Sequence, residues 1–173
     1  MIRNFKGYIP PVGFFFSVDV LNASGTPGPP SDSGFQEVSG ISVKMETTQI
    51  TEGGENRFTH KVPGRTSYED LVLKRGLLVR SSPLAVWVRE TLSKGLNNKI
   101  KPRTIKVSLL DANSDHQKPI KTWVFENAYP VKWEISSLDA QKSEIVIESL
   151  TFTYSHFYDN YEAASTDYPK KPN

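Results

Sequence analysis

Hydrophobic and polar residues alternate with a period of two along most of this chain, which is the pattern of half-buried β-strands. The runs that follow it, or that are dense in aromatic and β-branched residues, lie at 14–21, 41–46, 57–62, 71–75, 105–110, 120–131 and about 143–157. Each run is bounded by glycine, proline or small polar residues, as strands usually are. The chain is therefore predicted to be mainly β.

Turn residues indicate how two of these strands are joined. Gly53-Gly54 separates 41–46 from 57–62, which predicts a hairpin in which 41–46 is half-buried. Pro63-Gly64 is expected to close this hairpin, since proline cannot donate a hydrogen bond within a sheet.

The last run is unusually long. At about 3.3 Å per residue, a strand over 143–157 would reach roughly 50 Å. Such a strand either bends through two sheets or extends past its own domain.

One segment departs from the period of two. Leu84, Trp87, Val88 and Thr91 follow the i, i+3, i+4, i+7 spacing of one helix face. Ser82-Pro83 supplies a capping serine and a proline at the first helical position, and Gly95 is a suitable stop. We predict a single helix of about three turns that covers one face or end of the sheets.

Composition narrows the class of protein. The chain has 173 residues, 21 Lys and Arg against 19 Asp and Glu, and a formal net charge of +2. This balance does not favour a nucleic-acid binder or a membrane-surface protein. The lack of cysteine excludes disulfides, thiolate nucleophiles and zinc ribbons. No apolar run approaches about 18 residues and no secretory leader is evident, so we expect no membrane anchor and synthesis in the cytoplasm.

The domain organisation is expected to be simple. Residues 1–157 are predicted to form one domain, interrupted by a Gly-, Pro- and Ser-rich extended loop at 22–34. Residues 158–173 read as a polar C-terminal tail.

Residues that could carry chemistry are scattered. His60, His116 and His156 form no metal-spaced pair, and none of the common nucleophile, phosphate or zinc motifs is present. The 111–115 segment imitates a calcium loop, but His116 and Thr122 stand where that loop needs glycine and glutamate. We expect no catalytic, cofactor or metal site, and therefore no enzyme.

Large aromatic side chains are assigned to the structural core. This prediction covers Phe14, Phe16, Trp87, Trp123, Tyr129 and Trp133. The alternative is that Trp123, Tyr129 and Trp133 stack on a carbohydrate or peptide, as in a β-sandwich binding module. Aromatics on both faces of the first strand also suggest that another molecule covers one of them.

A small charged group lies on and near the predicted hairpin. Arg65, Lys74 and Arg75 are either solvated or paired within the chain, or they pair with Glu52 and Glu55 of a neighbouring copy.

Several of these segments, in this order, resemble the tail-tube proteins of contractile phages and contractile injection systems. The matching segments are 35–40 (FQEVSG), 52–56 (EGGEN), 63–65 (PGR), 71–76 (LVLKRG), 123–133 (with NAYPVKW) and 147–150 (IESL). The opening 10–14 (PPVGF) is most similar to the tube proteins of extracellular contractile injection systems.

The resemblance implies a fold of two packed antiparallel sheets, β-barrel-like, with one flanking helix. It implies hexameric rings that stack into a hollow tube, which sheath contraction propels. The implied partners are further copies, the sheath protein, the baseplate or spike hub, and a cargo effector in the lumen. Assembly is expected in the bacterial cytoplasm, with release by lysis. A tube-initiator ring that links the tube to the spike hub is the alternative.

By the same resemblance, the hairpin at 47–62 takes part in ring stacking. The residues assigned to stacking or to an interface are Glu52, Gly53, Gly54, Glu55, Asn56, Arg57, Arg65, Lys74 and Arg75.

Overall fold

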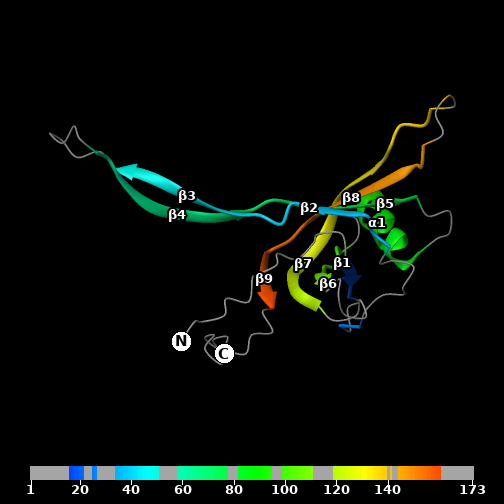
Figure 1. The fold of residues 1–173 in the computed structure, drawn as a ribbon, viewed down its shortest axis with the longest axis horizontal. Coiled ribbons are helices and arrows are strands. Elements are labelled where there is room, and N and C mark those ends of the chain that lie inside the picture. The colour runs from blue at the N-terminus through cyan, green and yellow to red at the C-terminus, as the bar shows by residue number, and fades with distance from the viewer. Residues whose placement is uncertain are drawn as a thin grey trace, which may run out of the picture.

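The computed structural model describes residues 16–21, 25–26, 34–50, 58–77, 82–94, 99–110, 119–139, 141 and 144–160. In chain order the elements are β1 Phe16–Val20, β2 Glu37–Ser39, β3 Val43–Ile50, β4 His60–Tyr68, β5 Leu71–Gly76, α1 Pro83–Lys94, β6 Arg103–Leu110, β7 Pro119–Ile135, β8 Ile147–Thr153 and β9 His156–Asn160. Figure 1 shows a body of packed strands from which β3 and β4 extend to one side.

The body consists of two antiparallel sheets that share the long strand β7. The first half of β7 pairs with β6 and β9, and its second half pairs with β8. Between the halves, Asn127 has a left-handed φ of 56° and the ladder shifts between Pro130 and Lys132. These irregularities let one strand turn from the first sheet into the second. The predicted mainly β class, with two antiparallel sheets and one flanking helix, is confirmed.

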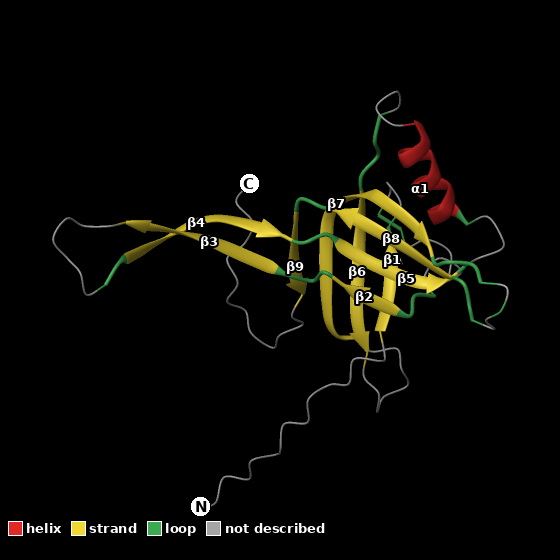
Figure 2. Ribbon diagram, turned by 90° about the horizontal axis from the view of Figure 1, so that it is seen from above, coloured by secondary structure: helices red, strands yellow, loops and turns green. Residues whose placement is uncertain are grey.

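The sheets curve toward a barrel without closing within the described residues. The strand order is β1-β6-β7-β8-β5-β2, and the two end strands, β1 and β2, do not pair with each other. Figure 2 shows these strands side by side, with α1 next to them.

The core lies between the two sheets and the helix. Its buried side chains include Val18, Leu71, Leu73, Leu84, Val88, Ile105, Phe125, Leu150 and Phe152. Trp87 of α1 stacks on Phe152 of β8, with ring centroids 5.7 Å apart and planes 18° from parallel. The helix therefore covers the second sheet, as the sequence predicts.

Local signals place the helix correctly. The backbone N–H of Ala85 donates to Ser82 Oγ at 3.1 Å, which satisfies one of the free donors at the helix start. The α1 residues Leu84, Trp87 and Val88 are buried, as the helical spacing requires. Gly95, the predicted stop, lies outside the described residues.

The final run bends between the sheets and does not extend past the domain. It breaks at Tyr154-Ser155, so that β8 lies in the second sheet and β9 pairs with β7 in the first. β9 also continues to Asn160, which corrects the expected start of the C-terminal tail at Tyr158. Period-two alternation alone does not reveal this break, because the residues on both sides keep strand character.

Two predictions for the hairpin are wrong. Pro63-Gly64 does not close it, since β4 passes through both residues and ends at Tyr68. The strand expected to be half-buried, β3, is exposed along its whole length. The first error arises because Gly64 lies in a bulge within β4 and not in a turn. The second arises because the hairpin projects from the body, so no sheet or helix of the described chain covers either face (Figures 1 and 2).

Candidate assembly interface

The most prominent surface feature is the β3–β4 arm, residues 43–50 and 60–68. Its two strands pair with each other and with no other described strand. An isolated two-stranded hairpin is only marginally stable in water. The segment that joins the strands, 51–57, lies outside the described residues, and with it Glu52, Gly53, Gly54, Glu55, Asn56 and Arg57.

Both faces of the arm carry apolar side chains over part of their length. Residues that are cross-strand partners share a face: the pair Val43 with Tyr68 lies on one face, and the pairs Thr48 with Val62 and Ile50 with His60 lie on the other. The large apolar side chains on the arm and next to it are between 36% and 57% exposed. They are Val43, Met45, Ile50, Phe58, Val62 and Tyr68.

A β-bulge in β4 separates two apolar patches. Met45 pairs with Thr66 and Thr47 with Pro63, so Gly64 and Arg65 together oppose Glu46 and the extra residue belongs to β4. β3 keeps its regular alternation, which places Val43 and Met45 on one face and Ile50, beside Val62, on the other. Gly64 permits the close approach, because a Cβ there would lie 3.0 Å from the Glu46 carbonyl oxygen.

Polar and basic side chains lie on both faces of the arm. Thr47, Gln49 and Lys61 share the face of Met45, whereas Lys44 shares the face of Ile50. These four residues and Arg65 are exposed. The arm is thus a ribbon with an uncovered apolar patch near its root on one face and a second one toward its tip on the other face.

A second apolar surface lies at the end of β7. Trp133 and Ile135 are the cross-strand partners of Leu150 and Glu148, two buried residues of β8. Cross-strand partners point to the same side of a sheet, so this side is the core side. Trp133 and Ile135 are nevertheless 42% and 46% exposed, because the core side of the sheet extends beyond the elements that pack on it. The assignment of Trp133 to the closed core is therefore wrong.

Trp133 is held in place by a buried ion pair. Its indole Nε1–H donates to Glu148 Oε1 at 3.0 Å, and Arg75 Nε donates to Glu148 Oε2 at 2.7 Å. Arg75 and Glu148 are only 1% and 4% exposed. Arg75 also lies over the Phe35 ring, 5.4 Å from its centroid.

The expected surface role of Arg75 is corrected by this geometry. Leu71, Leu73 and Arg75 alternate onto the core side of β5, where Glu148 is the direct cross-strand partner of Arg75. Lys74 points the other way and pairs with Glu37 at 2.7 Å within the same chain. Only Arg65 of the predicted basic group stays exposed on the arm.

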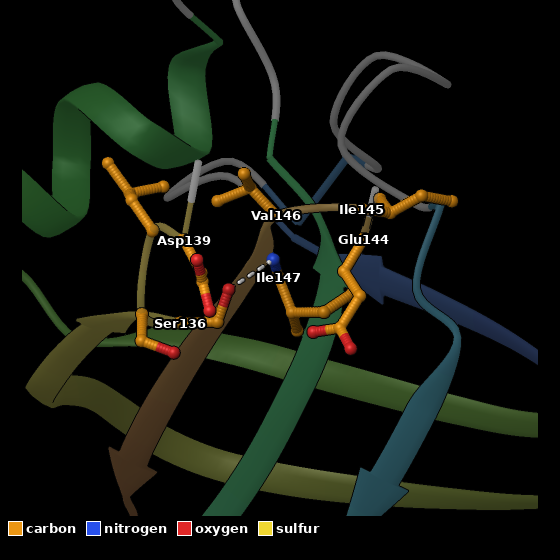
Figure 3. Close-up of a pocket in the computed structure, with 8 residues that line it drawn as sticks. Ser136, Asp139, Glu144, Ile145, Val146 and Ile147 are labelled. Atoms are coloured by element: carbon orange, nitrogen blue, oxygen red, sulfur yellow. Dashed lines mark hydrogen bonds between the residues drawn. The ribbon is translucent and has the colours of Figure 1, made fainter. Parts of the chain in front are cut away.

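The connection between β7 and β8 carries acidic and apolar side chains around a hollow of about 440 Å³ (Figure 3). Ser136 Oγ accepts a hydrogen bond from the Ile147 N–H at 3.0 Å, which ties the two sides of the connection together. Asp139, Glu144 and Ile145 are exposed along it. This arrangement provides a surface with both charge and apolar area, and it contains no pair of groups set for proton transfer.

An aromatic cluster joins the root of the arm to the body. Tyr68, the last residue of β4, contacts Tyr154 and Phe157 with ring centroids 5.9 and 5.6 Å apart. Tyr154 also packs edge-on against Phe125 at 4.9 Å. Burial, with smaller contributions from the nearby Asp70 carboxylate, Tyr68 and Glu69, raises the pKa of Tyr154 to about 12.

Two further features of the described part of the chain concern metal-binding groups and membrane-spanning helices. No group of its His, Asp and Glu side chains could hold a metal ion. Nor is any of its helices long and apolar enough to cross a membrane.

Comparison with known proteins decides the family. Residues 12–158 match the family model described as T4-like virus tail tube protein gp19. The chain belongs to this family. As a tail tube protein it is a structural component of phage tails and contractile injection systems, and membership confirms the expectation that it is not an enzyme.

Solved structures agree with this fold. A chain of the anti-feeding prophage baseplate, 6-fold symmetrised, is 28% identical and has a TM-score of 0.77, with 88% of this chain and 97% of that chain covered. A chain of the sheath–tube complex of an extracellular contractile injection system, PVC, is 22% identical with a TM-score of 0.70, covering 88% and 92%. An Hcp protein is 15% identical with a TM-score of 0.53, covering 87% and 94%. No curated protein sequence matches this chain.

The other predicted core residues of this tail tube protein are placed as follows. Trp87 is buried, and Phe16, Trp123 and Tyr129 are partly buried and pack against the core. Phe14 lies outside the described residues. Sequence reasoning missed Glu148 and Ile135, because a lone glutamate and isoleucine in a strand carry no signal of an unusual environment.

Proposed function

We propose that this tail tube protein forms hexameric rings that stack into a hollow tube, which a contracting sheath drives forward. The observation that supports the proposal most directly is the arm. Six large apolar side chains on and beside it remain between 36% and 57% exposed in the described chain. A lone protein rarely leaves so many together, because exposed apolar patches of this kind usually mark contacts with other molecules.

The placement of the apolar surfaces also favours ring formation. The arm and the end of β7 lie on opposite sides of the body in both views (Figures 1 and 2). Contacts between two different surfaces are heterologous, and they produce closed rings or open filaments and not isolated dimers. We propose that the arm, with Arg65 and the residues 52–57 at its end, lies in contacts between copies.

A position at the baseplate end of the tube is the second candidate. Identity is 28% to the chain of the anti-feeding prophage baseplate but 20% to a chain of the cap of that prophage. It is 22% to the PVC sheath–tube complex. This difference favours a tube-initiator ring that links the tube to the spike hub.

The remaining partners are part of the same proposal. The sheath would contact the outside of the tube, the baseplate or spike hub its lower end, and a cargo effector its lumen. Assembly would occur in the bacterial cytoplasm, with release by lysis.

Negative-stain electron microscopy of the purified protein over a concentration series tests the proposal. Hollow tubes of many rings are expected for the repeated tube subunit, and rings that never stack for the tube initiator. A monomer at every concentration, also in the presence of preformed baseplates, would contradict both.

A further inference from the structure

We infer that the face of the β3–β4 arm that carries Val43 and Met45 docks on the exposed end of β7 in a neighbouring copy, with Trp133 as the central anchor. This inference rests on the proposed assembly of copies. It adds to that function the surface that receives the arm.

The receiving surface is an uncovered continuation of the core. Trp133 and Ile135 lie on the same side of the sheet as Leu150, which is fully buried a few ångströms away across the ladder. Leu138 and Ile145, on the connection between β7 and β8, are 77% and 80% exposed and extend this apolar area. A sheet face of this kind is stabilised when another apolar element covers it.

The Trp133 side chain is already held in place in the single copy, before a partner binds. Its indole N–H is already bonded to Glu148, whose other oxygen is held by Arg75. The ring is therefore fixed while part of its surface stays exposed. A preorganised tryptophan loses little conformational freedom on binding, which is why such residues dominate the energetics of many interfaces.

The arm has the shape and polarity to cover this surface. Val43 and Met45 lie on the same face of β3 and are 55% and 57% exposed, so both can contact a flat partner. Burying that face removes apolar area from water on both copies.

Charge favours the same pairing. The arm carries Lys44, Lys61 and Arg65, and the connection beside Trp133 carries Asp139 and Glu144. The strands of a ribbon are only about 4.8 Å apart, so long basic side chains reach around its edge toward such carboxylates.

The occupant must be a second copy and not the arm of the same chain. The arm leaves the body on the side opposite to the end of β7 in both views. Its longer strand, β4, has nine residues and spans about 30 Å, directed away from that surface.

Cysteine cross-linking tests the contact directly, because the chain has no native cysteine. Protein with Met45→Cys is mixed with protein with Ile135→Cys, assembled, and oxidised mildly. Disulfide-linked dimers are expected from this pair. The matched control replaces Met45→Cys by Lys44→Cys, one residue away on the opposite face of β3, and should give no dimers.

The outcomes separate this inference from the proposed function. Rings or tubes that form without the Met45–Ile135 cross-link overturn the docking site but leave the proposed function standing. Equal cross-linking by the Lys44→Cys control also overturns it. Failure of the cysteine-free protein to assemble at any concentration overturns both.

A second pair of variants avoids dependence on disulfide geometry. Ile135→Lys should raise the concentration for half-maximal assembly at least about tenfold, since it places a charge in the contact. Ile120→Lys, at the other end of β7, is the control, because Ile120 is 45% exposed and Ile135 is 46% exposed. Circular dichroism and thermal unfolding verify that both variants fold. Assembly of folded Ile135→Lys at the wild-type concentration, or equal loss in both variants, contradicts the inference.

Discussion

Glu148 connects three strands through its two carboxylate oxygens, one bonded to Trp133 and the other to Arg75. A buried ion pair adds little net stability when intact, yet removing one partner leaves an uncompensated charge in the core. Sequence reasoning left Arg75 solvated, paired within the chain or paired with a neighbouring copy, and it did not locate the buried pair because Glu148 lies 73 residues away along the chain.

We predict that Glu148→Ala lowers the free energy of unfolding by about 3–5 kcal/mol. Tryptophan emission should also change, since the Trp133 indole loses its acceptor. Glu134→Ala is the control: Glu134 pairs with Lys132 at 2.8 Å on the surface, so its loss should cost less than about 1 kcal/mol. Urea unfolding measures both variants. Equal destabilisation by the two would contradict the special role of the buried pair.

Tyr154 makes the free energy of unfolding depend on pH in the alkaline range. Its pKa is about 12 in the folded protein against an ordinary value of 10.0, mainly because burial disfavours the charged phenolate. The folded state therefore keeps its proton where the unfolded chain loses it. This contribution is fully present below pH 10.0 and is lost as the pH rises toward about 12.

We predict that Tyr154→Phe reduces the loss of stability in that pH window. Near neutral pH the variant should be equal to the wild type or more stable by up to about 1 kcal/mol, because the buried hydroxyl has no hydrogen-bond partner among the described residues. Thermal unfolding from pH 8 to pH 12, on the order of one unit per step, measures the difference. Parallel pH profiles of the two proteins would refute the assignment to Tyr154.

At the scale of elements, α1 shows how a short sequence signal fixes a boundary. Ser82 and Pro83 meet the local requirements of a helix start, and the observed hydrogen bond from Ala85 to Ser82 Oγ is the interaction they predict. Such a signal succeeds because the residues that satisfy the first turn are adjacent in sequence.

Ser82→Ala should lower the free energy of unfolding by about 1 kcal/mol. Ser93→Ala is a matched control, because Ser93 lies in the same helix and donates only to the Arg89 carbonyl at 2.6 Å. Alanine at an exposed helical position has the higher propensity, so this control should be neutral or slightly stabilising. Denaturant unfolding followed by circular dichroism distinguishes the two. A Ser82→Ala variant as stable as Ser93→Ala would show that the cap contributes nothing.

The hairpin shows where such signals fail. Pro63-Gly64 has the composition of a turn, but here Gly64 lies in the bulge of β4 opposite Glu46, and β4 continues to Tyr68. The alternation in β3 predicts one buried face, and it identifies that face correctly as apolar. What covers it is not within the described chain.

At the scale of the whole molecule, the arm differs from the body in how few strands pair with it. Its strands hydrogen-bond only to each other among the described strands, whereas β7 pairs with three neighbours. Local opening is easiest where few buried contacts resist it.

Hydrogen exchange should therefore be fast in the arm of the unassembled protein and slow in β7. If the arm docks on another copy, assembly should slow exchange at Lys44 and Val62 while core positions such as Val107 stay unchanged. Mass spectrometry of monomeric and assembled fractions makes the comparison. Arm exchange that is equally fast in both fractions would exclude the arm from stable contacts between copies.

The sequence by itself determined the strands, the helix and its cap, and the family, because each of these depends on residues close together in the chain or on their order. Alternation sufficed for the shared face of Val43 and Met45. Only the tertiary structure decided that Arg75 is buried against Glu148, that the last run breaks at Tyr154-Ser155, and that Trp133 stays partly exposed. Those outcomes depend on which strands become neighbours and on how much of each sheet other elements cover. Both are properties of long-range packing and not of the local sequence pattern.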